Sequence, residues 1–319
     1  MKLLTYDSGS GPRCGVLSDN LVVDVSALLG VERTLYDVRA LLELPDSPIE
    51  RVRDALASDI AAPAVPLPMV RLRAPVLQPP TVRDFFSYEG HASGQGAREL
   101  HEAWYRLPIF YFSNTLRIFG HEDVAPFPSA TNRLDFELEL GCVIGREGSD
   151  IAAADALGYI AGFCIFNDFS ARDLQFDEMA VGLGPAKGKD SATVLGPWLV
   201  TTDELAPYLR DDRLQVKCTA RVNDDVWLDG GDGGAAHHSW GDFVERASRD
   251  SRIVPGDVLG SGTVSGGSVP EAIARGVASA RYLQPGDVVE LEVEGIGTLR
   301  NTLGPKAIDD PAYRYKPKA

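Results

Sequence analysis

The chain has 319 residues and a net charge of −15, from 31 basic and 46 acidic side chains. This excess of negative charge argues against nucleic acid or an anionic membrane surface as a partner, because both repel an acidic protein. The hydrophobic fraction of 44% and the charged fraction of 24% are those of an ordinary globular protein that can bury a full core.

The compartment is indicated by the cysteines and by the absence of long apolar runs. Four widely spaced cysteines have apolar or β-type neighbours and form no CxxC pair, so the spacings of zinc sites and redox motifs are absent. The N-terminus turns polar after two leucines, unlike a signal peptide, and the longest apolar run, near residues 159–166, is far shorter than a membrane span. We therefore expect a soluble cytoplasmic protein with reduced, mostly buried thiols.

Residues 1–75 predict a small N-terminal α/β domain that ends in a proline-rich connector. Strands are expected at residues 2–6, 15–17 and 21–25, and helices around residues 38–44 and 49–56. Six prolines between residues 63 and 80 make helix unfavourable there, so the connector is expected to be extended.

Residues 76–305 predict a β-rich catalytic domain with few helices. Short apolar runs separated by Gly and Pro predict strands at residues 136–144, 159–166, 198–201, 214–222, 258–260 and 288–293. The helices expected in this domain are short, at residues 99–105, 170–179 and 240–248. Residues 306–319 are polar and contain two prolines, which predicts a surface tail.

The most informative stretch is Leu134–Leu140, in which apolar and acidic residues alternate strictly. In a strand, this pattern places Asp135, Glu137 and Glu139 on one face. Neighbouring carboxylates on that face are roughly 6–7 Å apart, and their repulsion costs about 2–3 kcal/mol per pair at an effective dielectric of about 20. Either a hard divalent cation bound by oxygen ligands or the solvated face of an edge strand would relieve that repulsion. This stretch alone leaves both interpretations open.

Asp168 is a second acidic position, at the end of an apolar strand. Ser170 and Asp173 behind it resemble a capping box at the start of a helix. A carboxylate at a strand end beside a helix N-terminus is well placed to point into a cleft. Asp168 alone is more typical of a cap or turn, but with Glu137 and Glu139 it could complete a three-carboxylate cation site.

Two further segments carry groups of chemical interest. Residues 182–190 form a glycine-rich loop that presents Lys189 but breaks the phosphate-loop pattern. His91 leads into a Gly/Ser-rich segment, where a mobile, exposed imidazole could serve as a general base on a lid, although a lone loop histidine is more often inert. No GxSxG motif occurs, so a serine hydrolase has no support.

In their order along the chain, these segments resemble the fumarylacetoacetate hydrolase family. The matching motifs are Arg83-Asp84-Phe85…His91, Leu134-Asp135-Phe136-Glu137-Leu138-Glu139, Asn167-Asp168-Phe169-Ser170-Ala171-Arg172-Asp173-Leu174-Gln175, Gly184-Pro185…Gly188-Lys189 and Gly260-Ser261-Gly262-Thr263. The resemblance covers about residues 79–303. It implies an α+β, β-rich fold (a mixed β-sandwich roll), usually a homodimer, and a bound Mg²⁺ ion, with Ca²⁺ or Mn²⁺ as alternatives.

The resemblance also implies roles for particular residues. The implied metal ligands are Glu137, Glu139 and Asp168, joined by Asp84 in a subset of the family. The implied catalytic residues are His91 as general base, Glu271 as the group that orients it, and Lys189. The implied substrate-binding residues are Arg172 and Lys189 for anionic oxygens, with Gln175, Tyr111, Thr263 and Phe86 lining the pocket. Phe86 and Met179 stand where the name-giving enzymes carry tyrosines, so we expect a substrate other than fumarylacetoacetate. Asp135 matches no ligand position and is expected to lie behind the ligands or to face solvent.

The function implied is a metal-dependent hydrolase that cleaves a C–C bond in an acylpyruvate-like or other β-diketo acid. His91 and Glu271 would activate water, while the metal and Lys189 would stabilise the oxyanion and the enolate. The alternative is a decarboxylase, isomerase, hydratase or biosynthetic tailoring enzyme that uses the same metal–enolate site. A third interpretation is a metal-stapled binding protein without catalytic activity.

Overall fold

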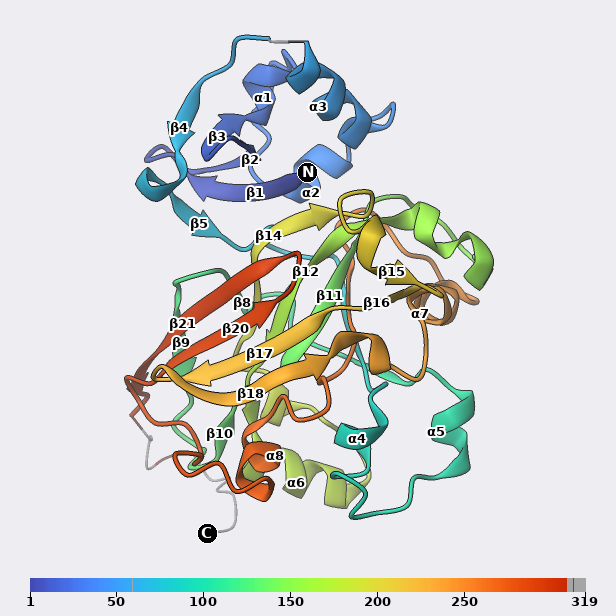
Figure 1. Cartoon of the computed structure of the whole chain (residues 1–319), viewed down its shortest axis with the longest axis vertical. Coiled ribbons are helices and arrows are strands. Elements are labelled where there is room, and N and C mark those ends of the chain that lie inside the picture. The colour runs from blue at the N-terminus through green and yellow to red at the C-terminus, as the bar shows by residue number, and fades with distance from the viewer. Residues whose placement is uncertain (59, 309–311, 313–319) are drawn as a thin grey trace.

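Two β-sheets build the fold of this computed structural model, which describes residues 1–58, 60–308 and 312. The larger sheet has twelve strands and the smaller sheet has five. Figure 1 shows the smaller sheet lying across one face of the larger one, with short helices at the ends and edges. The α+β, β-rich fold class expected from the sequence is therefore confirmed.

The N-terminal part of the chain forms one end of the larger sheet, at the top of Figure 1. Its strands are β1 (Lys2–Asp7), β2 (Pro12–Ser18), β3 (Leu21–Asp24), β4 (Ala64–Pro66) and β5 (Arg71–Arg73). Its helices are α1 (Val25–Leu28), α2 (Val38–Leu42) and α3 (Pro48–Ala57). The proline-rich connector contributes β4 and β5, which pair with β3 and β1. β1 also pairs with β14, with Leu3 opposite Leu199, and so joins this part to the rest of the sheet.

The rest of the larger sheet follows the order β14-β12-β11-β19-β6-β7, with β8 paired to β14. The bounds are β6 (Val82–Phe85), β7 (Phe110–Phe112), β8 (Ile118–Phe119), β11 (Leu138–Ile144), β12 (Ile160–Asp168), β14 (Thr193–Thr201) and β19 (Val258–Gly260). All nine residues of β12 are buried, because its two faces serve different cores. Phe163 and Ile165 pack in the core shared with the smaller sheet, whereas Cys164 and Phe166 pack in the core shared with the N-terminal helices.

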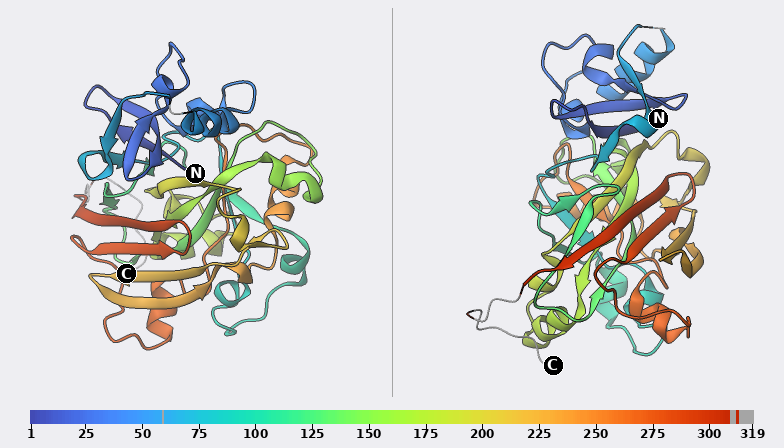
Figure 2. Two further views of the ribbon diagram at one scale, coloured as in Figure 1. Left: turned by 45° about the horizontal axis from the view of Figure 1, so that its top comes forward. Right: turned by 90° about the vertical axis from the view of Figure 1, so that its left-hand side faces the viewer.

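The smaller sheet has the order β18-β17-β20-β21-β9. Its strands are β9 (Val124–Phe127), β17 (Lys217–Val222), β18 (Asp225–Asp232), β20 (Val288–Val293) and β21 (Gly297–Lys306). A further two-stranded ladder pairs β15 (Leu209–Arg210) with β16 (Arg213–Leu214). The remaining helices are α4 (Glu89–Ala92), α5 (Glu102–Arg106), α6 (Arg172–Val181), α7 (Trp240–Ser248) and α8 (Val269–Ala274). Figures 1 and 2 show α4, α6 and α8 gathered at the end of the molecule opposite the N-terminal part.

The alternating stretch at residues 134–140 is interrupted, so the expectation of one continuous strand is wrong. β10 (Leu134–Asp135) pairs with β13 (Ser170–Ala171), Glu137 forms an isolated bridge with Ser268, and β11 begins at Leu138. The interruption arises because the chain exchanges one pairing partner for another within these few residues. Every residue of the stretch is buried, which rules out the solvated edge strand.

The expectation of a capping box at the start of α6 is also wrong. The Ser170 hydroxyl donates to the Asp168 carbonyl at 3.0 Å, and the residue before the helix makes no side-chain cap. Asp173 instead accepts the backbone N–H of Asn132 at 2.9 Å. Ser170 thus bonds within its own segment, and Asp173 connects α6 to the loop that contains Asn132.

Three other expectations concern the tail, the cysteines and the membrane. Lys306 ends β21, and the tail predicted at residues 306–319 lies mostly outside the described residues. All four cysteines are buried and unpaired. Within the described ranges, no helix combines the length and the apolar character needed to cross a bilayer.

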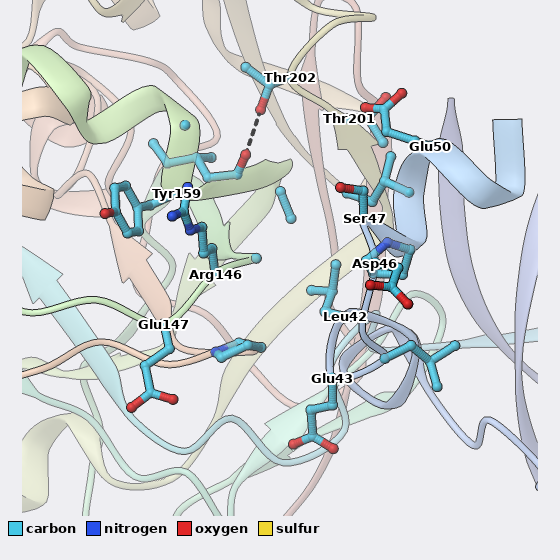
Figure 3. A pocket seen from close by; sticks show the side chains of 18 of the residues that line it. Leu42, Glu43, Asp46, Ser47, Glu50, Arg146, Glu147, Tyr159, Thr201 and Thr202 are labelled. Atoms are coloured by element: carbon cyan, nitrogen blue, oxygen red, sulfur yellow. Dashed lines mark hydrogen bonds between the residues drawn. The ribbon is translucent and has the colours of Figure 1, made fainter.

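A groove of about 810 Å³ opens between the N-terminal part and the rest of the chain. Figure 3 shows Glu43 and Ser47 on one wall and Arg146 and Tyr159 on the other. The Arg146 guanidinium lies 5.0 Å from the centre of the Tyr159 ring, and the Thr202 hydroxyl donates to a backbone carbonyl at 3.0 Å. None of the candidate site residues lines this groove, so the candidate chemistry lies elsewhere.

Candidate active site

Three strands of the larger sheet bring three carboxylates together. Asp84 lies on β6, Glu139 on β11, and Asp168 ends β12. One carboxylate oxygen from each residue lies within 4.8 Å of the other two, and all three side chains are buried. The expectation that Asp168 ends a strand beside the alternating stretch is confirmed. We call these three residues the carboxylate cluster.

Gly260 on β19 makes this close approach possible. It pairs with Asp84 on one side and with Gly141 of β11 on the other, so it lies between two strands of the cluster. A Cβ atom at residue 260 would lie 2.5 Å from Asp84 Oδ1 and 3.0 Å from Glu139 Oε2. The position therefore requires glycine, which is a physical reason for the Gly260-Ser261-Gly262-Thr263 motif.

The carboxylate cluster has the donor set of a hard-metal site. Asp84 Oδ1 and Asp168 Oδ1 are buried and have no hydrogen-bond partner among the described residues. Burial and then the charge of Asp168 raise the pKa of Asp84 to about 7, and burial and then the charge of Asp84 raise the pKa of Glu139 well above its usual range. Unpartnered buried oxygens are costly, and Mg²⁺, Ca²⁺ and Mn²⁺ all prefer carboxylate oxygens. The residues present fit a divalent cation.

Tyr111 bridges two members of the carboxylate cluster. Its hydroxyl lies 2.8 Å from Asp84 Oδ2 and also contacts Asp168 Oδ2. A phenol has one proton, so it can donate to only one of the two carboxylates at a time. Tyr111, expected from the resemblance to line the substrate pocket, therefore borders the cluster directly.

Glu137 lies beside the carboxylate cluster and is paired with cations. Its Oε2 contacts the Lys189 ammonium, and its Oε1 lies 2.5 Å from Arg172 Nη2. Lys189 Nζ also lies 2.6 Å from Asp168 Oδ2, so it joins Glu137 to the cluster. Burial favours the neutral acid, but the charges of Arg172 and Lys189 outweigh it and hold the pKa of Glu137 well below its usual range. The metal-ligand role of Glu137 stays a prediction.

Arg172 is engaged by the protein itself. Its Nε lies 2.7 Å from Asp135 Oδ2, its Nη1 lies 2.8 Å from Gln175 Oε1, and its Nη2 reaches Glu137. Asp135 is fully buried and also accepts the Val269 N–H at 2.7 Å, so the expectation that it could face solvent is wrong. The guanidinium fork thus sets the position of Glu137, and this arrangement leaves few donors for a substrate.

His91 and Glu271 form a hydrogen-bonded pair next to Glu137. His91 Nδ1 lies 2.9 Å from Glu271 Oε2, and His91 Nε2 lies 3.4 Å from Glu137 Oε1. A carboxylate can only accept, so Nδ1 donates to Glu271 and Nε2 is the nitrogen directed toward the carboxylates. Burial favours the neutral ring, but hydrogen bonds to Glu137 and Glu271 raise the pKa of His91 to about 9.

His91 differs from its expected placement in a mobile, exposed loop. It belongs to the short helix α4, and only 13% of its side chain is exposed. Its Nδ1 is hydrogen-bonded to Glu271, and the Phe86 ring lies nearly perpendicular to the imidazole, with the two ring centres 5.8 Å apart. We refer to residues 89–100, which carry His91, as the lid segment.

The structure brings all twelve candidate residues into one connected region. Thr263 Oγ1 lies 3.4 Å from Glu139 Oε1, Gln175 holds Arg172, and Phe86 packs on His91. Sequence reasoning missed the groups that hold Glu271, such as the Ser268 hydroxyl at 2.6 Å from Oε2. A serine three residues before a glutamate is a local signal, but its meaning depends on knowing that the glutamate faces His91.

Comparisons with known proteins identify the family of this chain. The family model of the C-terminal domain of fumarylacetoacetate (FAA) hydrolase matches residues 81–304. A mitochondrial oxaloacetate tautomerase of Bos taurus is 30% identical over 307 residues, which cover 94% of this chain and 91% of that protein. The oxaloacetate tautomerase YisK of Bacillus subtilis is 29% identical over 239 residues, 74% of this chain and 73% of that protein.

Solved structures agree on the fold. A 5-carboxymethyl-2-hydroxymuconate delta-isomerase of Mycobacterium smegmatis matches with a TM-score of 0.68 and 26% identity, over 96% of this chain and all of that one. A maleylpyruvate hydrolase of Sphingobium, solved with manganese(II) and pyruvate, matches with a TM-score of 0.72 over 96% of this chain and all of that one. At 20% identity, that likeness concerns the fold alone.

The fold and the carboxylate cluster define a metal-dependent type of enzyme built on a mixed β-sandwich. The chain belongs to the fumarylacetoacetate hydrolase family, because the family model covers well over half of it. The resemblance inferred from the sequence motifs is confirmed. The family model is that of a hydrolase, whereas the relatives named above include two tautomerases and an isomerase, so family membership indicates an enzyme without fixing its reaction.

We expect Mn²⁺ or Mg²⁺ to raise the melting temperature of the wild-type protein, because the ion would replace repulsion among the three carboxylates by attraction. At about 100 times the dissociation constant, the stabilisation is about 2.7 kcal/mol. Asp84→Asn and Asp168→Asn should abolish the shift, whereas Asp229→Asn, at an exposed position of β18, should retain it. Thermal denaturation with and without metal measures this. A wild-type protein that does not respond to either metal contradicts the site.

Replacing Arg172 by Met should lower the free energy of unfolding by about 3–5 kcal/mol, because Asp135 and Glu137 would remain buried without their cation. Urea denaturation measures the loss. Arg252→Met, at an arginine with a 70% exposed side chain, is the matched control and should stay within about 0.5 kcal/mol of the wild type. A stability loss below about 1 kcal/mol for Arg172→Met, together with a large rise in KM, would instead favour direct contact with substrate.

Proposed function

We propose that the chain is a divalent-metal-dependent hydrolase that cleaves a carbon–carbon bond in an acylpyruvate-like or other β-diketo acid. The observation that carries the proposal is the His91–Glu271 pair beside the carboxylate cluster, with a 2.9 Å hydrogen bond between them. Hydrolysis requires an oriented base that activates water, and a histidine fixed by a carboxylate meets that requirement. Enolate chemistry without water addition needs a group that moves a proton but no residue that activates water.

Asp84, Glu139 and Asp168 would hold the metal ion, and Glu137 would join them as the resemblance implies. Mg²⁺ is our first choice, with Ca²⁺ and Mn²⁺ as alternatives, because all three accept carboxylate oxygens. When bound, a divalent ion supplies Lewis acidity that polarises the carbonyl oxygens of a chelating diketo acid. The two unpartnered oxygens of the aspartates support this assignment.

His91 supplies the proton transfer in this proposal. Glu271 accepts a hydrogen bond from the Nδ1–H group, and this bond fixes both the tautomer and the plane of the ring. In the neutral ring, Nε2 is the unprotonated nitrogen, and it takes a proton from the water whose oxygen attacks the carbonyl carbon. Because the pKa of His91 is raised to about 9, the fraction of this neutral form increases as the pH rises toward that value. Cleavage of the adjacent C–C bond leaves a carboxylic acid and an enolate, and the enolate carbon then receives that proton from His91. One water is consumed, and an acylpyruvate yields a carboxylic acid and pyruvate.

Lys189 supplies a positive charge next to the reacting oxygens. Its ammonium carries three N–H donors, and Glu137 and Asp168 occupy two of them. The third donor can serve an oxyanion, and the buried position, with 4% of the side chain exposed, strengthens that interaction. The same two carboxylates hold the ammonium in place, so it needs no rearrangement during the reaction.

Keto–enol tautomerisation of a short 2-oxo dicarboxylic acid is the second candidate. It is favoured by the oxaloacetate tautomerase of Bos taurus, whose similarity spans nearly the whole of both chains. In that reaction His91 would move a proton between carbon and oxygen, and no bond between carbon atoms would break. The two candidates use the same residues and differ in their products.

We propose a homodimeric, cytoplasmic enzyme in addition, in line with the expectations from the sequence. Four buried cysteines without a disulfide support a reducing compartment. The dimer rests on the family resemblance.

With Mg²⁺ or Mn²⁺ present, the wild-type protein should convert acetylpyruvate into equal amounts of acetate and pyruvate, measured by NMR. His91→Asn should lower kcat by about 10²–10⁴-fold, the usual contribution of a general base. His101→Asn, at an exposed histidine of the same region, should retain activity. Interconversion of the enol and keto forms of oxaloacetate without cleavage products would favour the second candidate, and carbon dioxide release would indicate a decarboxylase.

A further inference from the structure

We propose that Gln95 is a positioning residue that orients Glu271 toward His91, an inference that rests on the proposed role of the His91–Glu271 pair. Gln95 lies in the lid segment, four residues after His91. Its amide Nε2 lies 2.6 Å from Glu271 Oε1. Nothing in the sequence pattern distinguishes it from a surface glutamine.

The Glu271 carboxylate accepts four hydrogen bonds, two on each oxygen. Oε2 accepts from His91 Nδ1 at 2.9 Å and from the Ser268 hydroxyl at 2.6 Å. Oε1 accepts from the Gly266 N–H at 2.8 Å and from Gln95. Two donors therefore come from the turn before α8, and two come from the lid segment.

This division matters because the terminal torsion of a glutamate is broad and weakly restrained. With donors on both oxygens, the plane of the carboxylate is fixed and Oε2 faces His91. Without Gln95, Oε1 keeps only the Gly266 N–H, and the carboxylate can turn away from the imidazole. Gln95 thus acts through Glu271, and none of its hydrogen bonds reaches the carboxylate cluster.

The backbone of the lid segment is shaped to present this side chain. Gly94, Gln95 and Gly96 have φ values of 62°, 60° and 83°, a left-handed run that favours glycine. The turn is closed by the Gln95 N–H, which donates to the Gly90 carbonyl at 2.7 Å, and by the Gly96 N–H, which donates to Ser93 Oγ at 2.8 Å. A glutamine between two glycines is unfavourable in this conformation, and its contact with Glu271 gives it a physical reason.

The test compares Gln95→Gly with Ala97→Gly in the metal-loaded full-length protein. Gln95→Gly removes the donor, and glycine suits the left-handed backbone, so the melting temperature should not fall. Ala97→Gly adds the same flexibility to the same turn without removing a contact to Glu271. For Gln95→Gly we expect kcat to fall about 10-fold, as for other residues that orient a catalytic group, with KM and metal affinity within about twofold.

Gln95→Asn tests whether the fall in kcat comes from the lost hydrogen bond or from the added flexibility of glycine. Asparagine tolerates the left-handed conformation, but its side chain is one methylene shorter and cannot reach Glu271, so kcat should fall as in Gln95→Gly. A kcat within twofold of the wild type in both variants overturns the proposal. An equal fall in Ala97→Gly overturns it as well, since it assigns the effect to loop flexibility, and so does a rise in KM at constant kcat.

A second measurement separates this inference from the proposed function. In protein labelled with ¹⁵N-histidine, the His91 Nδ1 proton should exchange with solvent about 10-fold faster in Gln95→Gly than in the wild type or Ala97→Gly. This readout needs no substrate. If the wild type cleaves no diketo acid, the proposed hydrolysis fails, while faster exchange still supports the role of Gln95. Unchanged exchange overturns the role of Gln95 whatever the reaction is.

Discussion

The repulsion among three buried carboxylates is the constraint on which the rest of the site depends. Their oxygens lie within 4.8 Å of one another, so each ionised pair costs at least about 3–4 kcal/mol at an effective dielectric of about 20. Three such pairs would cost about 10 kcal/mol, which is comparable with the whole stability of a typical domain. The fully ionised cluster therefore needs compensation. Protons provide it in part, as the raised pKa of Asp84 and Glu139 indicates, and a divalent cation would provide it more completely.

The surrounding structure holds this arrangement in place. β12 is packed on both faces by two hydrophobic cores, so the strand that ends at Asp168 has little freedom to move away from its neighbours. Gly260 admits the close approach of Asp84 and Glu139, and Lys189 adds a positive charge next to Asp168. The proton-transfer pair lies on α4 and α8, and His91 contacts Glu137, which lies beside the cluster.

The alternating stretch predicted the burial of its apolar side, and its four apolar residues do lie in one core. The alternation did not predict the interruption between β10 and β11, because strand pairing depends on partners more than thirty residues away. The same limit applies to Arg172. The resemblance implied a substrate contact for Arg172, which stays a prediction, but the sequence did not indicate its hydrogen bonds to Asp135 and Glu137, which depend on the meeting of two separate segments. Gln95 was the least predictable of these residues from the sequence, because only its tertiary contact with Glu271 distinguishes it.

Anomalous diffraction from crystals containing Mn²⁺ tests the central claim most directly, because it locates the ion without reference to activity. The account predicts one strong anomalous peak within bonding distance of carboxylate oxygens from Asp84, Glu139 and Asp168, with Asp84 Oδ1 and Asp168 Oδ1 no longer unpartnered. The absence of a peak at saturating Mn²⁺, or a peak whose ligands exclude both aspartates, would contradict it.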